Sequence, residues 1–486
     1  MDKLFQELEQ LYHQGTTRRH FLRQCSTGLG AVALAGLSAC GNNSKGVSSQ
    51  LDQQSPLVRA KHVIFLHMAG APSQLELFDY KPELAKLDGE LCPPSILQGK
   101  QFAFIQGQPR MLGPQAVFNQ HGQSGAWVSD LLPHLSTQVD EISFLKACHT
   151  DQFNHAPAQL LLHTGSAQLG RPGLGSWVSY GLGTENDNLP AYVVLVSGGA
   201  KPSAGKSLWG SGFLPTIHQG VQCRSKGDPV LYVNDPEGMP RDLRGRTIEA
   251  INRINETHYQ EVRDPEILTR IQQYEMAFRM QVSVPEVMDI KDEPSNILTL
   301  YGAEPGRASF ANNCLLARKL VEQGVRFVQL FDWGWDMHGN VAANSLSNAG
   351  MGAKCRDIDR PIAALIADLK QRGLLEDTLL VWGGEFGRTP MQENREGLTN
   401  PFQGRDHHTD AFTMWMAGGG VKPGLSFGST DEVGFAGVED RVHVHDLQAT
   451  ILHLLGVNHE QLTFPFQGRD FRLTDVAGKV IEPLLA

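Results

Sequence analysis

The chain has 486 residues, of which 41% are hydrophobic and 19% are charged. This composition excludes a coiled coil, a disordered acidic tail and a collagen-like rod. The formal net charge is -10 and the basic residues form no long runs, so the chain lacks the electrostatic footprint of a nucleic-acid-binding protein.

The N-terminal segment, residues 1–39, is predicted to be a signal peptide for the twin-arginine export route. An arginine pair in Thr17–Leu22 precedes the weakly apolar run Ser26–Ala35, which is too short and too rich in glycine to span a bilayer. Leu37–Gly41 resembles a lipobox, in which cleavage leaves a cysteine, here Cys40, to carry acyl chains. A chance amphipathic N-terminus is the alternative interpretation.

These signals predict an exported protein of the periplasm or cell envelope, held at the membrane by a lipid anchor at Cys40. Residues 40–60 are predicted to be a flexible tether, because they are rich in serine, asparagine and glutamine.

From residue 61 to the end, short apolar runs alternate with amphipathic stretches, which predicts one α/β domain with a large, mostly parallel sheet and crossover helices. The predicted strands are His62–His67, Ile142–Ala147, Ala191–Ser197, Arg326–Phe331, Thr378–Trp382 and Phe412–Ala417. The predicted helices are Ala156–His163, Leu174–Gly181, Ala308–Gln323, Ile358–Arg372 and Asp446–Leu455. Between about residues 225 and 300 the chain becomes charged, and we interpret this stretch as a helical insertion with helices Arg241–Val262 and Pro265–Arg279.

Residues that carry chemistry cluster near the predicted strand ends, where open parallel sheets place their sites. His155 opens a helix, and Asp336 and His338 follow a strand with the spacing of two metal ligands on an irregular turn. Glu385 and Arg388 leave the next strand through glycines. A structural ion pair is the alternative for the last two.

The segment Gly404–His408 contains Arg405, Asp406, His407 and His408, and adjacent histidines flanked by charges are hard to explain as packing. We expect metal ligands or acid/base groups there. By contrast, His443–Asp446 precedes a predicted helix, and capping by Asp446 explains it.

Taken together, these motifs resemble the bacterial exported family catalogued as domain of unknown function 1501, over Lys61–Leu485. The resemblance is carried by Gly70–Gln74, Phe78–Pro82, Trp335–His338, Gly384–Pro390, Gly404–His408 and Gly468–Leu473. That family looks related to the alkaline phosphatase and sulfatase superfamily. The resemblance implies a large α/β sandwich with helices on both faces, and divalent metals, zinc or calcium, in active relatives.

The sulfatase nucleophile motif matches His155–Gly165 at Pro157, Leu162, Thr164 and Gly165. Histidine stands at the nucleophile position, so the formylglycine chemistry of sulfatases is not expected here. The resemblance therefore implies the fold around the site but not the mechanism of sulfatases.

Two functions are consistent with these residues. The first is a metal-dependent hydrolase of small anionic phosphate or sulfate esters. In it, Arg388 or Arg405 steadies the anionic group, and His155 acts as ligand, acid/base or nucleophile. Its metal ligands are drawn from His67, Asp336, His338, Glu385, Asp406, His407 and His408. The second is a catalytically silent surface lipoprotein that binds glycans or a protein partner.

Overall fold

A computed structural model describes residues 58–199, 201–230, 240–395 and 398–486. The predicted signal peptide, most of the predicted tether and Cys40, the predicted site of the lipid anchor, lie outside the described residues. Within the described ranges, no helix is both long enough and apolar enough to cross a bilayer.

The chain divides into two compact units. The described part of the smaller unit, residues 240–278, contains helix α9 (Arg241–Val262) and the first part of α10 (Pro265–Met288). The two helices are in contact where the Phe278 ring of α10 lies against Arg241 of α9. The larger unit, Pro56–Val233 with Arg279–Ala486, contains all of the elements described below. α9 has the predicted bounds, whereas α10 continues beyond the predicted end in spite of Pro285.

The larger unit is built on one sheet of nine strands, in the order β12-β4-β11-β8-β1-β7-β5-β6, with β15 also paired to β4. All six predicted strands belong to this sheet, so strands from both sides of the helical stretch share it. The observed bounds are β1 (His62–Ala69), β4 (Ile142–His149), β5 (Tyr192–Ser197), β7 (Phe327–Trp333), β8 (Thr378–Gly383) and β11 (Phe412–Ala417). Short strands complete it: β6 (Val221–Cys223), β12 (Ser426–Phe427) and β15 (Val442–His443).

The sheet is mostly parallel, as predicted, and β11 is its antiparallel member. Every residue of β1 is buried, which explains its continuous apolar pattern: a central strand covered on both faces has no solvent side to mark by alternation.

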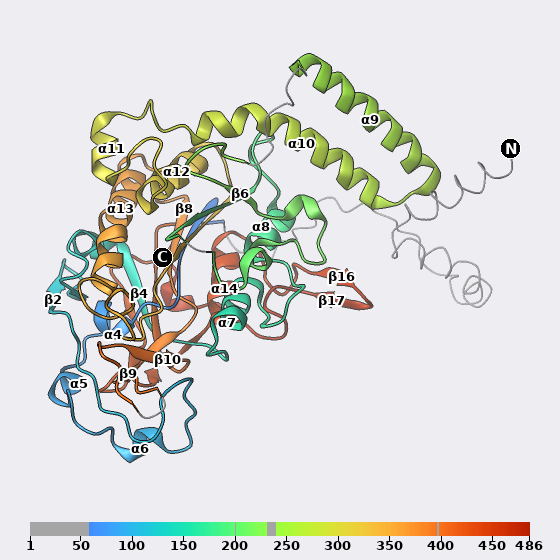
Figure 1. The fold of residues 1–486 in the computed structure, drawn as a ribbon. Coiled ribbons are helices and arrows are strands. Elements are labelled where there is room, and N and C mark those ends of the chain that lie inside the picture. Colours follow the sequence, from blue (N-terminus) through green and yellow to red (C-terminus); the bar gives the residue numbers. More distant parts are fainter. Residues whose placement is uncertain (1–57, 200, 231–239, 396–397) are drawn as a thin grey trace, which may run out of the picture. The chain divides into compact units, whose positions relative to one another are not determined.

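Helices cover both faces of the sheet (Figure 1). One face packs against α7, α8 and α14, and the opposite face against α12 and α13. The bounds of these helices are α7 (His155–Thr164), α8 (Leu174–Leu182), α12 (Phe310–Glu322), α13 (Met351–Gln371) and α14 (Val444–Leu454). The predicted α/β architecture with helices on both faces is therefore confirmed.

Two helix starts show how local sequence sets these boundaries. Ser309 caps α12 by accepting a hydrogen bond from the amide of Asn312 at 3.1 Å. His443 and Asp446 form a reciprocal capping box at the start of α14. The interpretation of His443–Asp446 as a capping segment is confirmed, with Asp446 in the first turn.

Candidate metal centre

The loops that follow β1, β7 and β8 meet at one edge of the sheet, because these three strands are parallel neighbours. Gly70, directly after β1, has φ +110°, and a Cβ atom there would lie 2.6 Å from the amide nitrogen of Asp336. Glycine at this position therefore allows the loop after β7 to lie against the end of β1.

Four side chains converge at this edge. His155, Asp336, His338 and His407 each present one ligand atom, and these atoms all lie within 4.8 Å of one another. The Oδ1 atom of Asp336 is 2.7 Å from Nε2 of His338 and 3.2 Å from Nε2 of both His155 and His407. We call these four residues the histidine–aspartate centre.

The centre is assembled from three parts of the fold. His155 is the first residue of α7, and Asp336 and His338 lie in the loop after β7. His407 lies on β10 (Arg405–His408), which pairs antiparallel with β9 (Gly387–Gln392) so that His407 is opposite Arg388.

The second ring nitrogen of each histidine has its own partner. Nδ1 of His155 lies 2.7 Å from Oε1 of Glu385, and Nδ1 of His407 lies 2.7 Å from the carbonyl oxygen of Phe153. Nδ1 of His338 hydrogen-bonds a carboxylate oxygen of Glu393. Because all three partners accept, each Nδ1 is a donor, which leaves Nε2 as the atom through which each histidine can bind a metal ion.

Glu393 belongs to the candidate site, although the sequence analysis did not name it. Its side chain is fully buried, and it also forms an ion pair with Arg395. It follows β9, a strand whose residues include arginine, threonine, proline and glutamine and so show no apolar pattern. The only sequence signal was a carboxylate close behind the Glu385–Arg388 motif.

Glu385 and His67 form a layer behind His155. Both side chains are completely buried, and Nε2 of His67 lies 3.3 Å from Oε2 of Glu385. Glu385 also accepts hydrogen bonds from the amide of Gly70 at 3.1 Å and from the side chain of Gln159 at 2.8 Å. These two predicted ligands therefore support His155 from behind rather than joining the four converging atoms.

Arg388 is held beside Asp336. Its Nη2 donates to Oδ1 of Asp336 and to the carbonyl of Gly70, its Nε to the carbonyl of Ala71 at 2.9 Å, and its Nη1 to that of Arg405 at 3.0 Å. With its donors used in this way, Arg388 orients the Asp336 carboxylate and has no open fork for a substrate anion.

Arg405 lies away from the centre, contrary to the role predicted for it. Its guanidinium is buried against Oε1 of Glu76, at 2.9 Å from Nε and 2.7 Å from Nη2, and it also donates to the carbonyls of Thr389 and Gly113. Because both charged groups are inaccessible to solvent, this pair is structural.

Asp406 and His408 also point away from the converging atoms. The Asp406 carboxylate accepts the amides of Phe104 at 2.7 Å and Ile105 at 2.9 Å, and burial raises its pKa. His408 hydrogen-bonds the carbonyl of Phe435, and its ring lies tilted against the Phe435 ring at 4.5 Å. Successive side chains of a strand point to opposite faces, so His407 reaches the centre and His408 does not.

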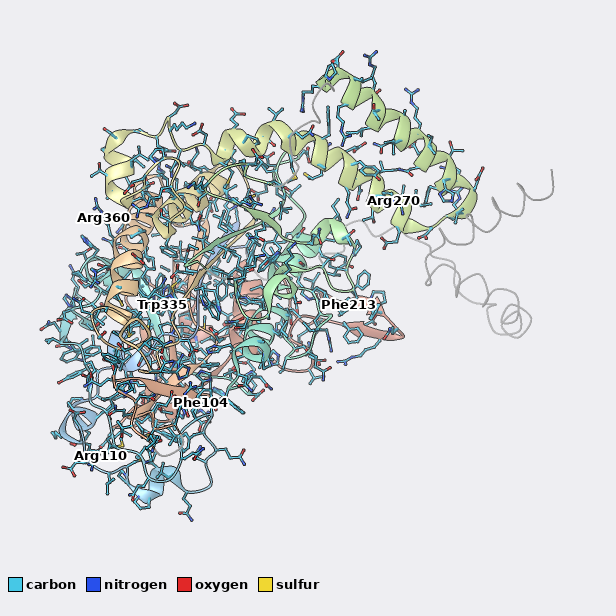
Figure 2. The ribbon with its side chains drawn as sticks, viewed as in Figure 1. Phe104, Arg110, Phe213, Arg270, Trp335 and Arg360 are labelled. Atoms are coloured by element: carbon cyan, nitrogen blue, oxygen red, sulfur yellow. The ribbon has the colours of Figure 1, made fainter. Side chains whose placement is uncertain are left out.

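Aromatic side chains border the centre. The ring of Phe104, which Asp406 positions, lies 5.2 Å from that of His338 and 5.5 Å from that of His407. Phe386 lies 4.6 Å from the His407 ring. Figure 2 labels Phe104 and also Trp335, a buried ring whose Nε1 donates to Asp332 at 3.0 Å.

Burial and neighbouring charges shift the pKa values of the side chains in the centre. Burial opposes the charge of His155, but the nearby carboxylates of Asp336 and Glu385 outweigh it and raise its pKa to about 9. Burial, with the positive charge of Arg388, lowers the pKa of His407 to about 4. Burial also opposes the charge of Asp336, yet Arg388 and the three imidazoles hold its pKa far below the usual range.

The donor set fits a metal ion. Four ligands on one ion at bond lengths of about 2.1 Å stand roughly 3.4 Å apart in a tetrahedron, which is close to the 3.2 Å from Asp336 to two of the histidines. Nε2 of His155 is buried and has no hydrogen-bond partner among the described residues, as expected of an atom reserved for a ligand bond. Each Nδ1 is anchored by an acceptor, which is the usual second layer around metal-binding histidines.

A family model described as "Protein of unknown function (DUF1501)" matches residues 60–485. No curated protein matches the chain.

Three solved structures illustrate the similar folds. The PsFucS1 sulfatase from Pseudoalteromonas sp. is 13% identical, with 84% of this chain and 69% of that chain covered and a TM-score of 0.37. The phosphonate monoester hydrolase SpPMH from Silicibacter pomeroyi is 12% identical, with 88% and 76% covered and a TM-score of 0.34. A mutant TAB5 alkaline phosphatase with bound Mg is 12% identical, with 83% and 100% covered and a TM-score of 0.32. The case for a function therefore rests on the side chains of the centre.

Proposed function

The chain belongs to the family described as "Protein of unknown function (DUF1501)", and we propose that it is a metal-dependent hydrolase of phosphate or sulfate esters. The proposed reaction centre is the histidine–aspartate centre, His155, Asp336, His338 and His407.

One observation carries the proposal: each of the three histidines has its Nδ1 fixed by an acceptor, so that three Nε2 atoms converge on one oxygen of Asp336. A buried cluster held only for stability has no need of three separately anchored imidazoles that share one focus.

The donor chemistry favours zinc over calcium. Calcium takes six to eight oxygen ligands, whereas imidazole nitrogen suits zinc and its first-row neighbours. With three nitrogen donors and one carboxylate oxygen, the centre offers a zinc-type set.

Access to the centre supports catalysis. With four protein ligands, catalysis needs solvent access, so that a water or a substrate oxygen can join the ion as a fifth ligand. The side chain of Asp336 is 28% exposed and that of His155 is 14% exposed, so the centre opens to solvent on the side of these two residues. A bound divalent ion supplies positive charge that activates water and polarises an ester oxygen.

The surrounding residues prepare the centre for that chemistry. Arg388 orients the Asp336 carboxylate, and Glu385 and Glu393 hold His155 and His338 in the required tautomer. The rings of Phe104 and Phe386 lie against the histidines and limit the access of water to that part of the centre.

Adjacent histidines provide the test of this proposal. We expect His407→Gln to lose zinc binding and ester hydrolysis together, because its Nε2 belongs to the centre. His408→Gln is the matched control, since its ring faces Phe435, and it should retain both. Zinc content is measured by mass spectrometry. Turnover of 4-nitrophenyl phosphate and of 4-nitrophenyl sulfate is measured before and after the zinc is removed with a chelator. Equal loss in both variants, or no turnover of either ester by zinc-replete wild type, would refute the hydrolase and favour a silent binding protein.

Glu393→Gln is expected to weaken zinc binding about 10- to 100-fold, because outer-layer partners of metal-binding histidines contribute that much. The change keeps the side-chain shape but removes the charge that fixes Nδ1–H of His338. Competition with a chromogenic chelator measures the affinity. Glu439→Gln, an exposed glutamate bonded to Ser429, is the control and should bind zinc as wild type does. Unchanged affinity in Glu393→Gln would exclude a supporting role for Glu393.

A further inference from the structure

A second feature of the carboxyl edge of the sheet is a cavity of about 810 Å³, which lies within the larger unit. Its walls come from the ends of β5, β6 and β7 and from the starts of α12 and α13. That volume falls within the range of sites that hold small ligands.

The cavity is positively charged on a protein whose formal net charge is -10. Its lining has two acidic side chains, Asp332 and Asp357, and six cationic ones, an excess of four positive charges. The cationic residues are Lys201, Arg224, Arg307, Lys354, Arg356 and Arg360. A concave surface with one sign of charge concentrates ligands of the opposite sign.

Most of this positive charge is not neutralised by the protein. Only Lys354, paired with Asp332, and Arg307, paired with Glu304, have carboxylate partners among the described residues. Arg356 and Arg360 are held by neutral groups, namely Asn348 and the carbonyls of residues 299 and 300. Arg360 is labelled in Figure 2 on α13.

The start of α12 adds to the positive charge of the cavity. Ser309, Phe310 and Ala311 line the cavity, and the first amides of a 13-residue helix carry its partial positive charge. Arginine forks match the oxygens of sulfate and phosphate groups.

Strand β7 and the loop that follows it link the cavity to the histidine–aspartate centre. Asp332 lines the cavity and Asp336 belongs to the centre, and four residues span at most about 14 Å. Between them, the partly exposed ring of Trp333 lies 6.4 Å from the ring of His155, and the backbone of Trp333 contacts Gly198 in the cavity wall. One substrate can therefore reach both places.

We propose that the cavity binds further anionic groups of the substrate, so that the substrate is an ester carrying at least two sulfate or phosphate groups. One ester group lies at the histidine–aspartate centre and the others lie in the cavity. The assignment of this ligand as substrate rests on the proposed function, whereas anion binding by the cavity does not.

The test is a binding measurement on full-length protein in the presence of a chelator. The probes are a fluorescently labelled, fully sulfated maltotetraose, tripolyphosphate as its competitor and unsulfated maltotetraose as the neutral form. We expect the double variant Lys201→Glu/Arg224→Glu to weaken binding of the sulfated probe at least about tenfold. The reason is that the two new carboxylates repel the sulfate groups of the probe. Both side chains are exposed, so folding should not suffer. Arg253→Glu, an exposed reversal on α9, is the control and should bind as wild type does.

The outcomes separate this proposal from the proposed function. Equal binding of the neutral tetrasaccharide, or undiminished binding by the double variant, would overturn the cavity proposal. His338→Ala should lose hydrolysis and keep the sulfated probe, since it belongs only to the centre. If wild type binds the probe through Lys201 and Arg224 but hydrolyses no ester, the hydrolase fails and the anion site stands. If tripolyphosphate displaces the sulfated probe, the cavity binds phosphate groups as well as sulfate groups. If it does not, the anionic groups that the cavity binds are limited to sulfates.

Discussion

Asp336→Asn is expected to weaken zinc binding by more than about 100-fold and to abolish measurable ester hydrolysis. Three imidazoles and the Arg388 guanidinium converge on one oxygen of this carboxylate. Since outer-layer substitutions alone cost about 10- to 100-fold in metal affinity, loss of a direct ligand should cost more. The amide keeps the shape of the side chain but not its charge, so Arg388 and a bound metal ion lose the negative charge that lies between them.

The control is Asp410→Asn, which removes a carboxylate paired with Lys100 on the loop after β10. It should retain zinc and activity, because its side chain lies outside the four converging residues. Zinc content and turnover are compared at equal amounts of folded protein. Full zinc content in Asp336→Asn would contradict the assignment of Asp336 as a ligand.

Arg405→Met is expected to destabilise the protein by about 3–5 kcal/mol, because it leaves the buried Glu76 carboxylate without its ion-pair partner. Urea unfolding in the presence of a chelator measures the change without a contribution from bound metal. Adding Glu76→Leu to Arg405→Met should recover part of the loss, since no buried charge then remains unpaired.

Lys86→Met is the matched control for Arg405→Met. It breaks the exposed pair with Glu83 and should leave the free energy of unfolding nearly unchanged, because solvent screens such a pair. The result also decides between two roles for Arg405. Unchanged stability with lost hydrolysis would support the anion-binding role that the sequence analysis predicted, and would contradict the structural pair described here.

The apolar pattern predicted the main sheet well because its central strands are buried on both faces. β1, β8 and β11 consist of residues that are all buried, so their sequences are mostly apolar and do not alternate with polar residues. The antiparallel direction of β11 could not be predicted, because a buried strand has the same pattern in either orientation. β9 and β10 were missed as a pair since their residues are mainly polar or charged.

The centre was predicted in part, through motifs at strand ends. His155, Asp336, His338 and His407 were all among the candidates, because the topology of a parallel sheet gathers such segments. Sequence proximity could not say which of two adjacent histidines faces the centre. It could not separate Arg388, which holds Asp336, from Arg405, which lies in a buried pair, because both belong to similar charged motifs.

The N-terminal interpretation stays a prediction. Export by the twin-arginine route and acylation of Cys40 concern residues that lie outside the described ranges, and acylation is checked by mass spectrometry of the mature N-terminus. The helical stretch is described as α9 and α10, whereas its status as an insertion of one domain also stays a prediction.

Metal analysis of the purified wild-type protein tests the central claim most directly. The protein is saturated with zinc, dialysed extensively and examined by inductively coupled plasma mass spectrometry beside His155→Ala. We expect one zinc ion per chain in wild type and its loss in His155→Ala, because three anchored imidazoles and a carboxylate form a single site. Wild type that retains no zinc, or His155→Ala that retains as much as wild type, would contradict it.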